Sequence, residues 1–441
     1  MRAWLSADTP SRNTFLNIHL RCDGRLALEA DVPGGGQPVV LGRTPLPIYS
    51  SHVTIASRVS SPRRVLVSCG EPSGDLYAGD LVHHLRDQAG PLEVFGLGGD
   101  RVQAEGGRLL AHVKDLAVVG LLEVLRHLRH LRAVFRAVLE EVDRDRPAVA
   151  VLVDYADFNL RLARELKARG VPVVYYVSPQ VWAWRRGRVR AIRESVAQMI
   201  VIFPFEEPLY REAGVPVTFV GHPLVELARP ARDRAAFLSA QGLDATRPVL
   251  AVLPGSRRQE VAHNLPPIAG ALRLLHQRRG DLQVALAIAP SLDPRLFDGE
   301  LAGLAVRRVA GHTHAILGAA SAGIVASGTA TVEAALMDLP MVVVYRVSRL
   351  TYALGRPFVR VPHYAMANLL AGREVVRELI QGDFRPEAVT AEVLALLEDP
   401  GRREPVRQGL AEIRARLGPP GASTRAAAVI AQLLERPSRK A

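Results

Sequence analysis

Short apolar runs recur along the chain from Arg64 onward, and segments with helical spacing of apolar residues separate them. The runs are apolar at nearly every position, which indicates strands buried on both faces, as in parallel sheets that helices cover. They fall into two series, each with predicted helices between its strands. The first series comprises 65–69, 93–97, 148–153, 172–177, 199–203 and 217–220, and the second comprises 248–253, 283–288, 305–309, 322–326 and 341–345.

The two series predict an α/β protein with two doubly wound, Rossmann-like domains. Ligands of such proteins bind at the carboxyl ends of the strands and in the cleft between the domains. We place the domains at 64–225 and 226–441, with the join near Pro223 to Pro230. After about residue 375 the pattern is helical, and we expect the last helix, near 423–436, to pack back on one of the two domains, with the first domain as one option.

Residues 1–63 differ from the rest of the chain. They are rich in Pro, Gly, Ser and Arg, contain Gly34-Gly35-Gly36, and show no sustained period. This composition is typical of a disordered extension, and a wrongly assigned start is the alternative. We expect no domain here, and the first predicted strand begins at Arg64.

A helix predicted over 118–135 carries Val, Leu and Phe around most of its circumference, interrupted by Arg and His. One interpretation is a core-facing helix with a wide apolar face. The other is an apolar and basic patch that touches a lipid surface. The pattern alone favours the core-facing helix.

Charge and composition exclude some partners. The chain has 441 residues and a formal net charge of +12, which suits nucleic acid, a membrane surface or an anionic substrate. Because only Lys114, Lys167 and Lys440 are lysines and the arginines are spread along the chain, we attribute part of the charge to genome composition. No aromatic-rich nucleic-acid motif is present, so nucleic acid is not expected as a partner.

Cysteine and histidine usage predicts neither disulfides nor a metal site. Cys22 and Cys69 form no disulfide framework or metal spacing, so a reducing compartment is expected. The histidines are scattered without acidic or thiol companions. No secretory signal is visible, and the longest uncharged stretch, Ala315 to Val332, reads as strand, turn and helix. We expect a protein that is soluble or at most bound to a membrane surface.

Two glycine-containing turns follow strands of the second series. Gly255-Ser256-Arg257 comes after the run 248–253, and Ser327-Gly328-Thr329 comes after 322–326. Glycine lets the backbone approach a ligand, serine offers a hydroxyl, and arginine can hold a phosphate through two N–H groups. Neither turn is a P-loop or a dinucleotide fingerprint, and each alone could be an ordinary capped turn. Together they favour a diphosphate at this sheet edge.

Glu333 lies one helical turn after Thr329. A diphosphate at the start of this helix would place a ribose near the carboxylate, and carboxylates bind ribose hydroxyls in dinucleotide folds. The alternative is an exposed acid that only favours the positive end of the helix. The pattern favours a sugar nucleotide.

In the first domain, Glu71 and Ser73 belong to a turn that closes the first strand and opens a helix, where Ser73 or Asp75 could act only as an N-cap. Asp154 follows the run 148–153, at the position where a general base would lie. We assign Asp157 as the helix cap. The segment 178–185 contains two tryptophans beside arginines, which suit either packing in the protein interior or an acyl chain or sugar.

Eleven segments, in order from about residue 64 to 435, closely resemble the lipid-A-disaccharide synthase family, bacterial glycosyltransferases with the two-domain GT-B fold. SPQVWAWR and NLLAGRE are specific to this family, whereas SGTATVE recurs across sugar-nucleotide enzymes. The matching segments are GEPSGD (70–75), RVQAEGG (101–107), VVGLLEVL (118–125), DYADFN (154–159), YYVSPQVWAWRRGRV (175–189), FPFE (203–206), FVGHPL (219–224), LPGSRRQEV (253–261), SGTATVEAAL (327–336), MVVVYR (341–346) and NLLAGREVVRELIQ (368–381).

The resemblance implies a reaction in which UDP-2,3-diacylglucosamine glycosylates 2,3-diacylglucosamine 1-phosphate. The product is the β-1,6-linked disaccharide 1-phosphate, and UDP leaves. Because the donor is α-linked, the reaction inverts the anomeric centre. The resemblance further implies Asp154 as the base, Arg257 as the diphosphate clamp, Asn368 as an active-site residue and Glu333 as the ribose ligand. It implies no metal or cofactor, a homodimer that exchanges carboxyl-terminal parts, and a cytoplasmic location on the inner-membrane surface. The membrane location strengthens the lipid-contact interpretation of 118–135.

Three alternatives remain at this stage. A UDP-N-acetylglucosamine 2-epimerase would share the fold and the acid-bearing helix, but it would not need an apolar acceptor surface. Another lipid-linked N-acetylglucosaminyltransferase would differ in its acceptor. A non-catalytic basic binding protein would bind nucleic acid or anionic vesicles and no UDP, and the paired glycine turns argue against it.

Overall fold

The computed structural model describes residues 15–20, 26–31, 62–116, 123–182, 187–348, 351–353 and 361–435. Within residues 1–63, where no element is expected, strands β1 (Phe15–Leu20) and β2 (Leu26–Asp31) form an antiparallel pair that sets Ile18 opposite Leu28. Leu16, Ile18 and Leu20 alternate with polar residues. This period-two signal is too short to stand out in a segment so rich in Gly, Pro and Ser.

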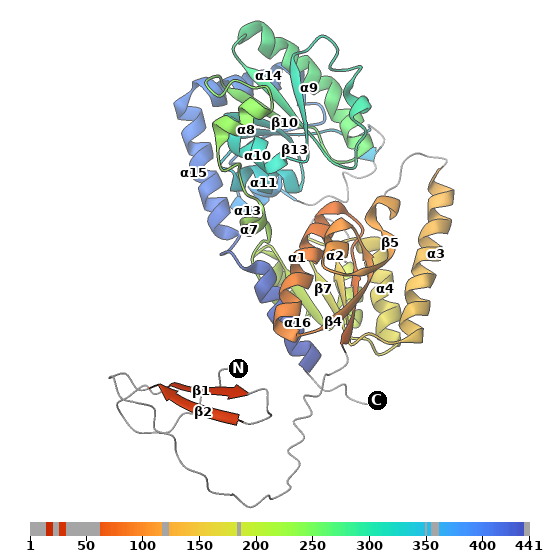
Figure 1. The fold of residues 1–441 in the computed structure, drawn as a ribbon. Coiled ribbons are helices and arrows are strands. Elements are labelled where there is room, and N and C mark those ends of the chain that lie inside the picture. Colours follow the sequence, from red (N-terminus) through yellow and green to blue (C-terminus); the bar gives the residue numbers. More distant parts are fainter. Residues whose placement is uncertain are drawn as a thin grey trace, which may run out of the picture. The chain divides into compact units, whose positions relative to one another are not determined.

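The first sheet is fully parallel, with the strand order β5-β4-β3-β6-β7-β8-β9 (Figure 1). The order reverses between β3 and β6, as in a doubly wound fold. We call residues 62–223 the first lobe. Its strands are β3 (Arg63–Ser68), β4 (Leu92–Gly98), β5 (Arg108–His112), β6 (Val149–Val153), β7 (Val173–Tyr176), β8 (Gln198–Val201) and β9 (Val217–Phe219). Its helices are α1 (Pro72–Ala89), α2 (Asp100–Ala104), α3 (Glu123–Arg144), α4 (Ala156–Ala168), α5 (Arg188–Ser195) and α6 (Glu206–Glu212), with a 3-10 turn at Val113–Leu116.

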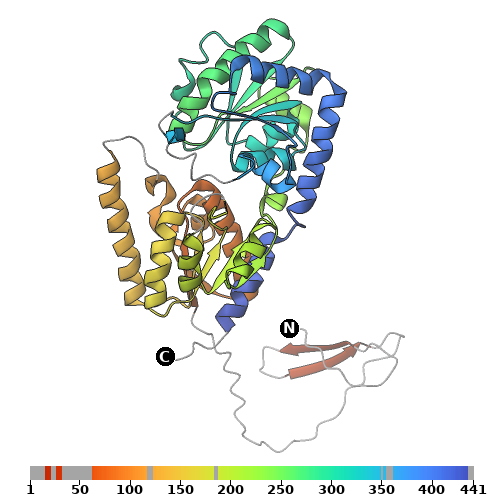
Figure 2. The same ribbon diagram turned by 180° about the vertical axis from the view of Figure 1, so that it is seen from behind.

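Helices cover both faces of this sheet, as Figure 2 shows from behind. Val65 and Val67 pack on the α1 side, whereas Leu66 packs with Leu162 of α4 and Val138 of α3. The alternation follows from the two-residue period of a strand. Because both faces are buried, β3 and β6 are apolar throughout their centres, which is why the sequence predicts them well.

Strands of the second lobe, residues 224–417, repeat this plan with the order β12-β11-β10-β13-β14-β15, again all parallel. The order reverses between β10 and β13. The strands are β10 (Val249–Leu253), β11 (Gln283–Ile288), β12 (Val306–Ala310), β13 (Ala322–Ala326), β14 (Met341–Tyr345) and β15 (Arg377–Ile380). The helices are α7 (Leu224–Leu227), α8 (Arg234–Ala240), α9 (Arg258–Arg278), α10 (Thr313–Ala319), α11 (Thr329–Leu336), α13 (Met366–Ala371), α14 (Pro386–Glu398) and α15 (Pro400–Arg416), with a 3-10 turn at Pro294–Phe297.

The last helix, α16 (Ala422–Glu435), returns to the first lobe and lies along α1 (Figure 1). The Gln88 side-chain amide donates to the Thr424 carbonyl at 2.9 Å, and Arg425 Nε donates to the Val220 carbonyl at 2.9 Å. Ala426, Ala427 and Ile430 are buried in the same apolar cluster as α1. The chain therefore crosses between the lobes twice, at α7 and before α16.

All eleven predicted strands are present, with ends displaced by at most two residues. Within the two lobes, two strands are missing from the prediction, β5 and β15, and both lie at a sheet edge. β5 reads Arg-Leu-Leu-Ala-His with no fully buried residue, and β15 reads Arg-Glu-Leu-Ile. An edge strand is half solvated and lacks the continuous apolar run by which the central strands are found.

Of the helix predicted over 118–135, α3 begins at Glu123, and side chains are described from Arg129 onward. Val134 and Val138 are buried, whereas Arg129, Arg132 and Arg136 are exposed. This part of the helix therefore has one core-facing side and one basic side, and the segment 117–122 lies outside the described residues. In the part of the chain that the structure describes, no helix is long and apolar enough to cross a membrane.

Candidate functional site

Except for Asn368, the predicted site residues of both lobes follow the four strands at which the strand order reverses. Glu71 and Ser73 come after β3, and Asp154 comes after β6. In the second sheet, Gly255 to Arg257 come after β10, and Ser327 to Thr329 come after β13. Loops diverge in opposite directions at such a switch point and leave a crevice at the carboxyl ends of the strands. Both switch points thus carry the polar side chains from which the site is built.

Asp154 lies in a strained turn between β6 and α4. Asp154 and Tyr155 have φ angles of 47° and 51°, a left-handed conformation that few residues other than glycine adopt. The Asp154 carbonyl accepts hydrogen bonds from the Tyr175 hydroxyl at 2.6 Å and from the Asn159 side-chain amide at 2.8 Å. Asn159 is fully buried and also binds Ser68 at the end of β3. These bonds fix the backbone that carries the Asp154 carboxylate.

The Asp154 carboxyl group is suited to proton transfer near neutral pH. Burial and, after it, the nearby Glu71 carboxylate together raise its pKa from 3.8 to about 6, against the opposing effects of a Tyr155 backbone hydrogen bond and of Arg257. At pH 7 most of the population is therefore ionised and can accept a proton. A base with a pKa near 6 holds the proton more strongly than an ordinary aspartate does.

Glu71 and Arg257 form an ion pair between the loops after β3 and β10. The Arg257 guanidinium donates through Nη2 to both Glu71 carboxylate oxygens, at 2.7 and 2.9 Å. Arg257 is the N-cap residue of α9 and its side chain is largely exposed. The pair brings the Glu71 loop of the first lobe to the Arg257 loop of the second. Asp154 is electrostatically coupled to both side chains, so the three charged groups form one cluster.

The Gly255 turn already holds a carboxylate, that of Glu260. Glu260 Oε2 accepts hydrogen bonds from the backbone N–H groups of Ser256 at 3.0 Å and Arg257 at 3.4 Å. Gly255 has a φ of 129°, and a Cβ at this position would lie 2.4 Å from the Glu260 carboxyl carbon. Only glycine therefore fits here. An anion at this turn would rely on the Ser256 hydroxyl and the Arg257 guanidinium, since these two amides are engaged.

The Ser327 turn is more open. Gly328 has a φ of 144°, and no atom lies within 4 Å of the place where its Cβ would be. Gly328 and Thr329 are exposed, and α11 begins at Thr329. The Ser327 hydroxyl, by contrast, donates to the Tyr364 carbonyl at 2.7 Å and so anchors the turn. The exposed backbone of Gly328 and Thr329 is the part left for a ligand.

Glu333 is held by a residue that the sequence analysis does not single out. His314 Nε2, at the start of α10, lies 3.2 Å from Glu333 Oε2, and both side chains are mostly buried. Burial and, after it, the Glu333 carboxylate raise the pKa of Tyr77 on α1. No spacing rule connects residues 314 and 333 before the fold is known. Their contact orients the Glu333 carboxylate.

Asn368 is not brought together with the other predicted residues. It is fully buried, its amide nitrogen donates to the Val376 carbonyl and to Glu378 at 2.8 Å each, and its oxygen accepts from the Val375 and Val376 amides. Glu378 in turn accepts from the amides of Tyr364 and Ala365. Asn368 is thus linked through Glu378 to the segment that anchors Ser327. This geometry supports a positioning role, and a direct substrate contact stays a prediction.

The predicted helix caps need correction. Ser73 and Asp75 both lie inside α1, whose N-cap residue is Glu71. The buried Asp75 carboxylate instead accepts hydrogen bonds from the Gly99, Arg101 and Val102 amides at 2.6 to 3.2 Å, and so caps α2. Asp157 is also not a cap, because Tyr155 holds that position in α4 and the Asp157 carboxylate pairs with Arg188.

Trp182 is bound inside the first lobe. Its indole N–H donates to Glu206 Oε1 at 3.2 Å, and its ring packs edge-on against Phe205. Burial raises the pKa of Glu206 to about 8, so this carboxyl group is largely protonated at neutral pH. The packing interpretation therefore holds for Trp182, and Trp184 lies outside the described residues. Among the residues described, no three His, Cys, Asp or Glu side chains are grouped to hold a metal ion.

Known structures share this architecture. A UDP-N-acetylglucosamine 2-epimerase from Neisseria meningitidis, solved with UDP-GlcNAc, superposes with a TM-score of 0.61 at 10% identity and covers 84% of this chain and 100% of its own. The calicheamicin glycosyltransferase CalG4 superposes with a TM-score of 0.52 at 17% identity and covers 85% of this chain and 99% of its own. At such low identities the likeness concerns the fold alone. The predicted GT-B arrangement of two Rossmann-like domains is confirmed.

Similarity in sequence identifies the family more narrowly than similarity in fold does. A model of the family described as lipid-A-disaccharide synthetase matches residues 65–430. The lipid-A-disaccharide synthase of Myxococcus xanthus is 46% identical over 378 residues, which are 85% of this chain and 99% of the relative. That of Koribacter versatilis is 46% identical over 360 residues, which are 80% of this chain and 93% of the relative. With this match across both lobes, the chain belongs to the lipid-A-disaccharide synthase family of glycosyltransferases.

Proposed function

We propose that this protein transfers 2,3-diacylglucosamine from UDP-2,3-diacylglucosamine to the 6-hydroxyl of 2,3-diacylglucosamine 1-phosphate, with inversion at the anomeric carbon. Family membership supports the reaction. One structural observation supports the mechanism: Asp154, with a pKa near 6, lies in a charged cluster with Glu71 and Arg257 at the switch points of both sheets.

In the proposed step, the acceptor 6-hydroxyl oxygen attacks the anomeric carbon while Asp154 removes the hydroxyl proton. The bond between the anomeric carbon and the diphosphate oxygen breaks, and UDP leaves with its electron pair. Arg257 stabilises the negative charge that develops on the diphosphate. Because Arg257 binds Glu71 in this structure, the donor must compete with this ion pair for the guanidinium.

Other predicted residues have supporting roles in this proposal. The Gly255 and Ser327 turns flank the diphosphate, and Glu333, oriented by His314, accepts hydrogen bonds from the uridine ribose. Glu71 prepares the site by holding Arg257 and by raising the pKa of Asp154. Ser73 lies in the first turn of α1 without a described side-chain bond and is proposed to contact the acceptor. No metal is assigned a role.

Location and assembly also belong to the proposal. We expect the protein to act at the cytoplasmic face of the inner membrane, where its diacylated substrates reside, and to form a homodimer. The exposed Arg129, Arg132 and Arg136 on α3 support contact with anionic lipids. Vesicle co-sedimentation with and without charge reversal of these arginines tests the membrane contact.

The decisive assay uses purified protein, both substrates, detergent and EDTA, with mass spectrometry of the products. Formation of the disaccharide 1-phosphate and UDP, with a β-linkage by NMR, supports the proposal and metal independence together. Deuterium uptake at sugar C2 from UDP-N-acetylglucosamine in D2O would instead indicate an epimerase. UDP binding without product from this acceptor would leave the donor site intact and refute the acceptor assignment.

A further inference from the structure

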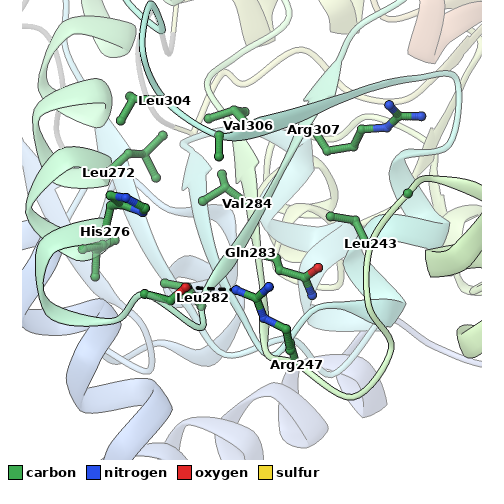
Figure 3. A pocket seen from close by; sticks show the side chains of 14 residues that line it. Leu243, Arg247, Leu272, His276, Leu282, Gln283, Val284, Leu304, Val306 and Arg307 are labelled. Carbon is green, nitrogen blue, oxygen red and sulfur yellow. Dashed lines mark hydrogen bonds between the residues drawn. The ribbon is translucent and has the colours of Figure 1, made fainter.

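A cavity of about 390 Å³ lies at the amino ends of β10, β11 and β12, at the end of the second sheet that is opposite to the candidate site (Figure 3). The five residues of β10 separate the two ends by about 16 Å at 3.3 Å per residue. None of its lining residues belongs to the candidate site. They are Gly242, Leu243, Arg247, Leu272, Leu275, His276, Gly280, Leu282, Gln283, Val284, Leu304, Ala305, Val306 and Arg307.

Most of the lining is apolar. Leu272 and Leu275 come from α9 and are buried in the core of the second lobe. Leu243, Val284 and Leu304 are only partly buried, so the cavity presents apolar surface that the fold itself does not cover. Removing such surface from water is worth about 25 cal/mol per Å². The cavity therefore favours a ligand with an apolar body.

The charged residues of the lining are all basic. Arg247 donates to the backbone carbonyls of Asp281, at 2.9 Å, and Gly280, at 3.0 Å, and not to a carboxylate. Figure 3 shows its bond to the lining carbonyl. Arg307 is exposed, and among the described residues its side chain has no ion-pair or hydrogen-bond partner. Its guanidinium carbon would lie 4.0 Å from a Cβ on Gly242, so both arginines border the same loop. The Arg307 guanidinium is thus available to a ligand. Arg247 keeps N–H groups beyond those that bind the two carbonyls, and the nearby Asp244 and Asp281 carboxylates offset part of its charge.

Acidic side chains near Arg247 are already engaged. The Asp281 carboxylate pairs with Arg279, and the Asp244 carboxylate accepts hydrogen bonds from the Thr246 amide and hydroxyl. Arg308, the residue after Arg307 in β12, forms an ion pair with Asp298. Arg307 has no such partner from its own chain.

We infer that this cavity binds a single-chain anionic amphiphile, with a fatty-acid carboxylate as the fitting class. The alkyl chain would lie on the leucines and valines, and the carboxylate would bind Arg307 and the free N–H groups of Arg247. The volume lies at the lower end of the range for ligand pockets, which suits one chain better than the two chains of a diacylated sugar. This site goes beyond the proposed transferase reaction and does not depend on it.

Isothermal titration calorimetry with decanoate, below its micellar concentration, tests the inference on the full chain. Decanol and decyltrimethylammonium serve as uncharged and cationic controls. We expect decanoate to bind best, Arg307→Glu to weaken it by about tenfold or more, and Ala305→Trp, which fills the exposed mouth, to abolish it. Arg278→Glu makes the same charge change on an exposed residue outside the lining and should leave the affinity unchanged.

Three results would overturn the inference. If decanol binds as tightly as decanoate, the arginines do not bind the carboxylate. Decanoate binding that Ala305→Trp and Arg307→Glu leave unchanged would place the fatty acid elsewhere, for example at the acyl-sugar site. A concentration-dependent dimer that Ala305→Trp dissociates, without decanoate binding, would assign the apolar lining to a second copy of the chain. UDP affinity, measured in parallel, confirms that each variant is folded.

Discussion

Replacing Asp154 by Asn should cut turnover by orders of magnitude and yet stabilise the protein at alkaline pH. The Asp154 backbone has a φ of 47°, and asparagine tolerates this left-handed conformation at least as well as aspartate does. The substitution therefore keeps the turn and removes only a charge. Burial and the Glu71 carboxylate disfavour that charge, as the raised pKa of Asp154 shows.

The size of the gain follows from the pKa. A displacement from 3.8 to about 6 is about two units, or about 3 kcal/mol at about 1.4 kcal/mol per unit. Solvent screens the partly exposed side chain, so we expect about 1–3 kcal/mol. Because the folded-state pKa is raised, the ionised carboxylate destabilises the fold fully above pH 6. The penalty declines as pH falls below 6 and disappears only well below pH 3.8, where the group is protonated in both states.

Urea unfolding at pH 8 and pH 4.5, followed by tryptophan fluorescence, measures this effect. Trp182 packs in the first lobe, against Phe205, so its fluorescence reports on the lobe that carries Asp154. Asp157→Asn is the matched control, since the Asp157 carboxylate is exposed and paired with Arg188. If Asp154→Asn is less stable than the wild type at pH 8, or gains equally at both pH values, the buried-charge reasoning is wrong.

Three further results are expected. The kcat/KM of the wild type should fall at acid pH with an apparent pKa near 6, tenfold per pH unit below it. Glu71→Gln should move this acid limb of the pH–rate profile to lower pH. An acid limb near pH 4 in the wild type would exclude Asp154 as the titrating base. Arg257→Ala should weaken UDP binding by about 10- to 100-fold in calorimetry, since it removes charge-assisted hydrogen bonds to the diphosphate, and unchanged affinity would refute the clamp. Asn368→Ala should lower the free energy of unfolding by about 2–4 kcal/mol in urea, because it leaves several buried groups around Glu378 and Val376 unpaired. A variant that is as stable as the wild type but inactive would indicate direct substrate contact instead.

Sequence reasoning locates the strands of both lobes because the central strands of a parallel sheet are buried on both faces and therefore continuously apolar. β5 and β15 are missed because edge strands lack that signal. The positions of Asp154 and Gly255 after β6 and β10 follow from the predicted strands, and the doubly wound topology makes such strand ends the predicted place of a ligand. Their chemistry, however, depends on neighbours distant in sequence.

Three contacts show why these neighbours could not be predicted. Glu71 and Arg257 are 186 residues apart and meet only when the two lobes are assembled. His314 reaches Glu333 through the tertiary contact of α10 with α11. Asp75 looks like a cap of its own helix, but its side chain faces the start of α2, which no local rule anticipates. The local sequence pattern predicts where helices and strands lie and which residues stand at their ends. The hydrogen-bond and ion-pair partners of those residues are known only once the chain is folded.

The account rests on Asp154 as the base, and the turnover of Asp154→Asn with both substrates, measured together with its affinity for UDP, tests it most directly. General-base catalysis contributes about 10²- to 10⁴-fold, so kcat should fall by that factor while the UDP dissociation constant stays within about twofold of the wild type. Near-normal turnover in this variant would contradict the assignment of the base and the mechanism built on it.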